Sequence, residues 1–312
     1  MEVLSVISFL KKENGAVLML FAILLPVLLG CTAIVVDFGS QYACKVRLDN
    51  IAQAAALAAA QDLQADAGLA EDKAYEYLNL NGIEDQHAQV QVSGYDNSVE
   101  VTIQRDVDFF FGRILGLEDR RISSKAKAIS TGLTSLSGAA PLGILSQDFV
   151  YGQLYKLKCG APPEFGSGNF GALRLGGSGS SVYEENLKYG YQGKIEVGDI
   201  IETKSGNISG PTQRAISYRF SQDSRVPPNT IDDYDRNAPQ IIYIPVVEPY
   251  QTNDNHVYSV RVLGFAAFFV AGIPGSGDDS EIEGYFIRTV HSGTGSEGQP
   301  DYGLTTSKLV NP

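Results

Sequence analysis

Residues Ala16 to Val36 read AVLMLFAILLPVLLGCTAIVV, a run of 21 residues without a charged side chain. As a helix this run is roughly 32 Å long, which matches a bilayer hydrocarbon core of about 30 Å. The run therefore predicts a transmembrane helix, so that residues 1–36 form an N-terminal tail and an anchor whose first partner is the lipid bilayer. Pro26 is compatible with such a helix and predicts at most a kink.

The charges that flank the run predict its orientation. Lys11 and Lys12 precede it and Asp37 closes it. A basic pair on a short tail favours a cytoplasmic N-terminus, although Lys45 and Arg47 lie close to the other end and oppose this. We therefore expect a single-pass protein of the cell membrane whose C-terminal domains are extracytoplasmic.

Two other interpretations of the run, a cleaved secretory signal and a lipoprotein signal, fit its sequence less well. A cleaved secretory signal has an apolar core of about 7–15 residues and an A-x-A-like site; this run is longer and lacks the site. The residues Leu28-Leu29-Gly30-Cys31 resemble a lipobox, but the sequence stays apolar through Val36, where a lipidated cysteine would be followed by a polar tether.

The helix is expected to continue beyond the membrane as a stalk that ends at about Leu63. Apolar residues recur there at steps of four and three, which places them on one helix face. These residues are Cys44, Leu48, Ile51, Ala55 and Ala58. The small side chains of Ala54–Ala60 would let another helix approach closely, or the same face could pack on the protein's own first domain. The pattern leaves both readings open.

Residues 37–131 are predicted to form the stalk helix and a small α+β domain. A second helix over 69–80 ends at Asn81-Gly82. Alternating valines around the turn sequence SGYDNS predict a hairpin. The apolar residues Phe109–Leu117 are expected to be helical, and Ile122–Thr131 to form a third strand.

Residues 132–141 contain Gly, Ser and Pro and are expected to link this domain to a distal extracytoplasmic one over 142–312. The distal domain is predicted to be mixed α/β and rich in strands, which makes the fold class α+β overall. We expect strands at 170–175, 194–203, 240–247, 257–271, 282–291 and 305–310, and helices at 181–189 and 211–220. The apolar stretch Val262–Ile273 is too short to cross a membrane and predicts a buried central strand.

The N-terminal fifth of the chain carries a pattern of motifs: KKENGA at residues 11–16, Leu25-Pro26 in the apolar run, VDFG at 36–39 and LDNIAQAAALA at 48–58. This pattern resembles the TadE/TadG-like proteins of Tad-type (Flp) pilus assembly. The resemblance implies a part in assembling thin adhesive pili, or in related secretion, with other pilus-assembly membrane proteins as partners through the Ala-rich stalk helix. The anchor and stalk positions that carry it are Gly15, Ala16, Pro26, Asp37, Leu48, Ile51, Ala55 and Ala58.

The chain departs from related patterns at two points. Pilin-like members that are cleaved by a prepilin peptidase carry a glutamate shortly after the cleavage glycine, whereas Leu20 stands at the corresponding place after Gly15. This difference favours permanent anchoring. Some long TadG-like proteins carry a domain with a D-x-S-x-S metal motif, which this sequence lacks.

The remaining residues predict no catalytic site, cofactor or metal site. The net charge of −12 argues against nucleic acid as a partner, and the three cysteines form no C-x-x-C motif. Two G-x-G-x-x-G matches, at 166–171 and 293–298, are expected to be loops. His87, His256 and His291 are far apart in sequence. The acidic clusters at 232–235 and 278–281 could hold calcium, but Gly- and Asp-rich turns explain them as well.

The function expected from these observations is that of a membrane-anchored, non-enzymatic component of Tad/Flp-type pilus assembly or related secretion. An anchored extracytoplasmic adhesion or ligand-binding module is the alternative. An anchored hydrolase is the third possibility, and no motif in the sequence supports it.

Overall fold

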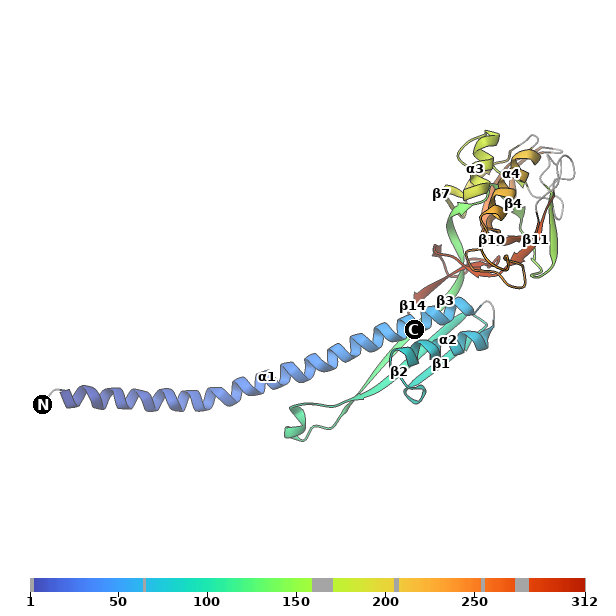
Figure 1. Ribbon diagram of the computed structural model, residues 1–312. Helices are drawn as coiled ribbons and strands as arrows, with labels where there is room; N and C mark the ends of the chain where they lie inside the picture. The colour runs from blue at the N-terminus through green and yellow to red at the C-terminus, as the bar shows by residue number, and fades with distance from the viewer. Residues whose placement is uncertain are drawn as a thin grey trace.

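A computed structural model describes residues 3–63, 66–158, 171–204, 208–253, 256–272 and 281–311. Figure 1 shows a long helix, α1, that runs from the N-terminus to two β-rich lobes, with its C-terminal part packed against the first of them. The class is α+β, as the sequence predicts, and the strands carry most of the two lobes.

Helix α1 (Val3–Asp62) is 60 residues long and contains Pro26. The expected membrane segment and the expected stalk are therefore one continuous helix, which ends one residue before the predicted Leu63. Residues 37–62 alone extend roughly 39 Å at the usual rise per residue. A helix of this length carries the lobes on a single stiff element.

The first lobe packs α1 and α2 (Ala67–Leu80) against an antiparallel sheet. Its hairpin consists of β1 (Ala88–Ser93) and β2 (Ser98–Val107), with Val90 opposite Val101 and Val92 opposite Val99. A short 3₁₀ turn, η1 (Asp85–His87), precedes β1. The buried residues of α1, α2 and the sheet form one apolar core. This confirms the predicted second helix and hairpin.

The stretch predicted as a linker is instead β structure. Strand β3 (Arg120–Ala139) is 20 residues long and runs through the expected boundary at residue 131, and β4 (Leu142–Leu145) follows almost at once. Leu133 and Leu136 are buried, so the stretch expected to link the two domains is a packed strand over most of its length. A Cβ on Gly132 would collide with the carbonyl of Pro300, which shows that this glycine serves close packing.

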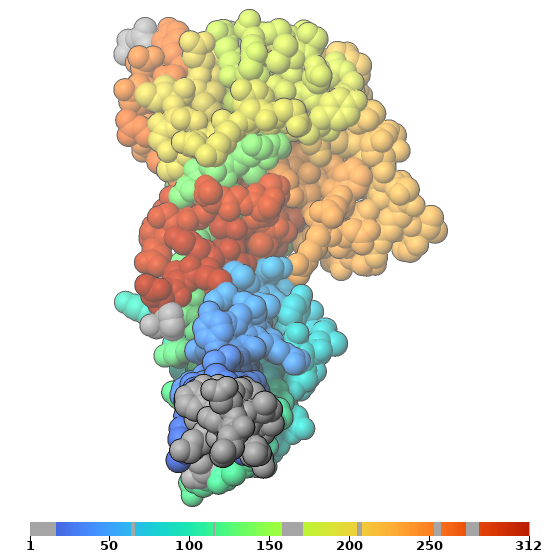
Figure 2. Space-filling view, turned by 90° about the vertical axis from the view of Figure 1, so that its left-hand side faces the viewer, coloured from blue at the N-terminus to red at the C-terminus, as the bar shows by residue number. Residues whose placement is uncertain are grey.

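Strand β3 belongs to both lobes. Its first half pairs with β2 and with the C-terminal strand β14 (Leu304–Val310), and its second half pairs with β7 (Tyr191–Glu196) and β13 (Thr294–Gly295). The C-terminal strand thus returns to the first lobe. Figure 2 shows the C-terminal segment, in red, lying between the two lobes. The proposed division at residues 131 and 142 stays a prediction.

The second lobe is built on a sheet whose central strands are β9 (Ile241–Asn253), β10 (His256–Val270) and β11 (Glu281–Ile287), in that order. The smaller strands are β5 (Leu154–Lys158), β6 (Gly171–Ala172), β8 (Ile200–Glu202) and β12 (Thr289–Val290). The helices α3 (Ser180–Tyr189) and α4 (Ser209–Ser221) pack on one face of the sheet, where Tyr183 and Ala215 enter the core.

The distal strands lie near their predicted positions, but their lengths differ from the predicted ones. Residues 262–270 of the predicted apolar stretch lie in β10, with β9 and β11 as its neighbours, and form a mostly buried central strand as predicted. Ala271 follows the strand and is exposed, and Ile273 lies outside the described residues. The strand expected at 194–203 is divided into β7 and β8, because Gly198 adopts φ +97° in a turn. β4 and β5 were not predicted. The helix expected at 109–117 is a short 3₁₀ helix, η2 (Gly112–Leu115).

Candidate functional site

The apolar part of α1 is uncovered on all sides. Within the described residues, α1 is the one helix long and apolar enough to cross a membrane, and none of its most apolar window is buried in the protein. Large apolar side chains from Val17 to Val36 point outward around its whole circumference. A helix that is apolar all round needs an apolar environment, and this segment therefore has the character of a bilayer anchor. Gly15 and Ala16 lie in α1, and their surroundings fall outside the described side chains.

Asp37, the residue that closes the apolar run, is held by the loop between β2 and β3. The Phe110 N–H donates to Oδ1 at 2.8 Å and the Gly112 N–H donates to Oδ2 at 2.7 Å. The Phe111 N–H donates to both oxygens at 3.2 Å. Three successive backbone N–H groups form an anion-binding concavity, and here they lie at the start of η2. Asp37 as a whole is 4% exposed.

The chemistry of this contact requires an ionised carboxylate. Burial by itself would raise the pKa of Asp37, but the N–H groups of Gly112, Phe111 and Phe110 outweigh it, so its pKa lies below the ordinary value. A Cβ on Gly112 would lie 2.9 Å from that of Phe109. The loop therefore needs glycine at the position whose N–H makes the shortest bond to Asp37.

One face of α1 packs against the first lobe from Asp37 to the C-terminal end of the stalk. It contains the predicted stalk residues Leu48, Ile51, Ala55 and Ala58, all of them buried. Leu48, Ile51 and Ala55 belong to the core that α1 forms with α2 and the sheet. Of the two interpretations that the sequence left open, packing on the protein's own first lobe describes this face. The Ala-rich stripe is thereby covered, although Ala54 beside it is exposed.

Polar contacts accompany the apolar ones along this stripe. Gln41 is buried one turn after Asp37, and the Arg120 guanidinium donates to its Oε1 at 3.5 Å. Asp49 accepts hydrogen bonds from Lys45 Nζ and Ser124 Oγ, both at 2.5 Å. Each of these contacts joins α1 to β3 or orients a side chain that does so. The helix and the hairpin therefore lie against each other in a fixed register.

The carboxylates of this lobe predict how its stability depends on pH. The pKa of Asp49 is lowered because Lys45 and Ser124 outweigh the opposing effect of burial, and the pKa of Asp96 is lowered by hydrogen bonds from Lys127, Ser93 and Ser98. A carboxyl whose folded pKa is depressed stabilises the fold above its unfolded pKa of about 3.9, and this contribution is lost as the pH falls toward the folded value. The thermal unfolding temperature of the lobe should be unchanged between about pH 7 and 5 and should fall below about pH 4. An unfolding temperature that rises as the pH falls below about 4 would contradict this prediction.

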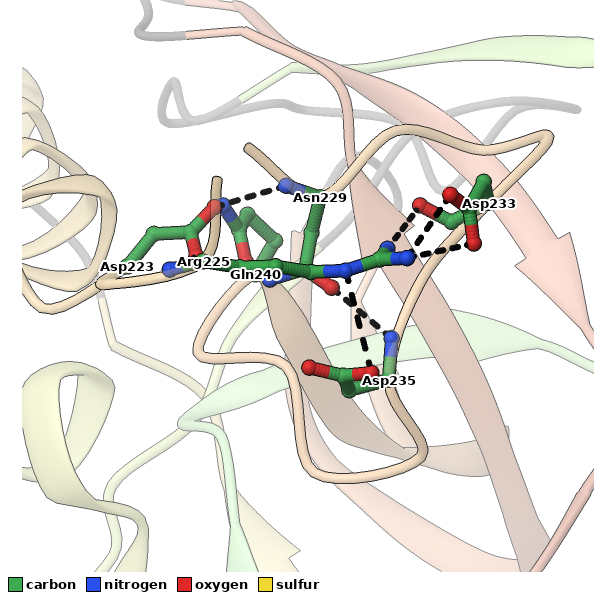
Figure 3. Close-up of polar contacts among 6 residues, drawn as sticks. All are labelled: Asp223, Arg225, Asn229, Asp233, Asp235 and Gln240. Carbon is green, nitrogen blue, oxygen red and sulfur yellow. Dashed lines mark hydrogen bonds and ion pairs between the residues drawn. The ribbon is translucent and has the colours of Figure 1, made fainter. Parts of the chain in front are cut away.

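The acidic cluster at 232–235 is a structural brace. Figure 3 shows the guanidinium of Arg225 between the carboxylates of Asp233 and Asp235. Its Nη2 donates to both Asp233 oxygens at 2.7 Å. Asp223 accepts hydrogen bonds from the Asn229 amide and from the Gln240 amide, each at 2.7 Å. These contacts fold the loop between α4 and β9 and give Asp223, Asp233 and Asp235 protein partners.

The other candidate motifs bring no chemistry together among the described residues. No three His, Cys, Asp or Glu side chains there gather in a way that could hold a metal ion. Gly293 and Gly295 belong to β13 and its approach to β3, where a Cβ on either glycine would collide with Leu133 or Thr131. His291 packs edge-on against Tyr243. Gly166, Gly168 and Asp278–Ser280 lie outside the described residues.

The β2–β3 loop is the feature that the sequence analysis missed. Asp37 and Gly112 are 75 residues apart in sequence, and no local pattern indicates that they meet. The apolar residues 109–117 were recognised, but as a helix. The one signal for this contact is the position of residues 109–117 between two strands that are long enough to reach back along the stalk.

Comparison with known proteins matches part of α1. Residues 15–62 match the family model described as putative Flp pilus-assembly TadE/G-like. No curated protein and no solved structure matches the chain. The family match begins at Gly15, directly before the apolar run, and ends where α1 ends. It thus covers the anchor and the stalk together.

Proposed function

We propose that this chain, whose anchor and stalk match a TadE/G-like family model, is a membrane-anchored, non-enzymatic component of Tad-type pilus assembly or related secretion. The observation that carries the proposal is the identity of the matched segment, since residues 15–62 form one helix that is apolar over the span and then becomes part of the core of the first lobe. The N-terminus lies in the cytoplasm and both lobes lie outside, in keeping with Lys11 and Lys12 before the span.

The proposed partner surface is the uncovered side of the stalk. Because the Ala-rich stripe packs on the first lobe, a second membrane protein would approach α1 from the opposite side. The large side chains Phe38, Tyr42 and Val46 are exposed there at steps of four residues, which places them on one ridge. This ridge continues the uncovered span directly into the aqueous phase.

The sharpest test of the assembly role removes the span and leaves the stalk. Deletion of residues 16–36 spares the core that α1 forms with the first lobe, whereas a deletion of 15–62 would also destroy that core. We expect the deletion to release the protein from the membrane fraction and to abolish surface pili, scored by electron microscopy. The full-length protein should resist extraction by high salt and should be dissolved by detergent.

A matched control separates anchoring from assembly. In this control, residues 16–36 are replaced by an unrelated apolar segment of the same length, which restores the anchor. Substitution of Tyr42→Glu in the native chain then tests the ridge, because Tyr42 is exposed and contributes little to the fold. Loss of pili with intact membrane localisation would support a partner contact. Normal pilus numbers after deletion of the span would refute the assembly role.

A further inference from the structure

The tip of the β2–β3 hairpin exposes a cluster of large apolar side chains. Phe110 and Ile114 are 71% and 81% exposed, and Phe111 and Leu117 also face outward. Soluble surfaces rarely expose such a patch without a reason. The patch stands at the end of a hairpin that extends beside α1 toward the N-terminus (Figure 1).

Asp37 fixes the height of this patch relative to the anchor. Its carboxylate is bound by the N–H groups of Phe110, Phe111 and Gly112, and it is the first residue after the apolar run that ends at Val36. The tip therefore cannot lie far above the membrane boundary of α1. The exposed side chains next to it on α1, Val36 and Phe38, are apolar as well.

Several charged groups of the loop lie around the patch and are paired with one another. Arg113 forms ion pairs with Asp108 and Asp119 at 3.2 and 3.3 Å, and Arg121 pairs with Asp106 at 2.9 Å. Aromatic and aliphatic side chains flanked by polar groups are typical of segments that enter the headgroup region to a depth of about 5–10 Å. With acidic and basic groups nearly balanced, apolar burial and not attraction to anionic lipids would drive this contact.

We propose that the β2–β3 tip is a second membrane contact, in which Phe110, Phe111, Ile114 and Leu117 enter the lipid interface beside α1. Asp37 serves as the positioning residue for this contact. With two attachments, the first lobe is held against the bilayer at a fixed tilt and rotation, so that its distal neighbour is presented in one orientation. The inference uses the anchor of the proposed function and is independent of any role in pili.

The absence of tryptophan from the sequence permits a direct test. Full-length protein is reconstituted in zwitterionic lipid vesicles as three single-tryptophan variants. Phe110→Trp reports the tip and Leu25→Trp reports the anchor. Tyr95→Trp reports the β1–β2 turn, a fully exposed position at the other end of β2, about 33 Å away for a strand of ten residues.

We expect lipid-borne quenchers to quench Phe110→Trp and Leu25→Trp, with the shallow quencher more effective on the first and the deep quencher on the second. Tyr95→Trp should respond only to aqueous iodide. Adding Asp37→Ala to Phe110→Trp should reduce its lipid quenching, while Leu25→Trp with the same change keeps its own. If Leu25→Trp is quenched by lipid but Phe110→Trp is as open to iodide as Tyr95→Trp, the tip faces water or a protein partner and the inference is wrong. If Leu25→Trp itself is not quenched, the anchor fails, and the inference fails with it.

Discussion

The Ala55→Glu variant should lose the folded structure of the first lobe while its membrane anchor remains inserted. Ala55 is completely buried in the core formed by α1, α2 and the sheet. Overpacking by the larger side chain would lower the free energy of unfolding by about 1–3 kcal/mol. An unpaired buried charge would lower it by several kcal/mol more. The sum is of the order of the whole stability of a small domain, about 5–15 kcal/mol.

The neighbouring position supplies the matched control. Ala54→Glu introduces the same side chain into the same helix, but Ala54 faces solvent, so the fold should be unaffected. Amide hydrogen exchange in β2 and β3 measures the difference for both variants in vesicles. Equal protection in the two variants would show that the stalk stripe is not packed on the lobe. Loss of pili in Ala54→Glu with full protection would place a partner on the exposed side.

The anchor and the stalk could be predicted from sequence because their determinants are local. Twenty-one uncharged and mostly apolar residues specify a span regardless of what surrounds them, and the recurrence of Leu48, Ile51 and Ala55 indicates helix periodicity. The same periodicity could not identify the covering element. A stripe of alanines fits a second helix and a sheet equally well, since both need small side chains at close approach.

The contact at Asp37 and the course of β3 could not be predicted for a different reason. Both depend on pairs of residues that are distant in sequence, such as Asp37 with Gly112 and Gly132 with Pro300. A glycine that accommodates a neighbouring backbone looks, in one sequence, like a glycine that breaks a strand. The Gly and Ser residues of 132–141 were for this reason interpreted as a linker, where Leu133 and Leu136 in fact enter the core.

Truncation after Gly303 should have an effect on the first lobe, although the removed residues are the last in the chain. β14 pairs with β3 over six residue pairs, from Thr305 opposite Gly132 to Val310 opposite Lys127. Each lost ladder hydrogen bond costs about 0.5–1.5 kcal/mol. Loss of Leu309 also uncovers part of the first-lobe core, whereas loss of the buried Leu304 falls on the core of the second lobe. The total is expected to be about 5 kcal/mol or more, which is enough to destabilise the lobe strongly.

The physical basis of this effect is the position of β14 at the point where β3 passes from one lobe to the other. Without β14, only residues 127–129 of the segment 127–132 still lie opposite a residue of β2, since the β2 register ends at Ser98 opposite Ile129. Amides near Gly132 should then exchange quickly and a protease should cleave β3 there, which would separate the anchored lobe from the distal one. Removal of residues 311–312 alone should change neither result, because β14 ends at Val310. The informative amides are Ile129 and Thr131, opposite Lys308 and Thr306 of β14, because the Ser130 N–H donates to the Asn97 carbonyl on the other side. Protection of these two amides that survives the longer truncation would show that β3 is held at this crossing without the C-terminal strand.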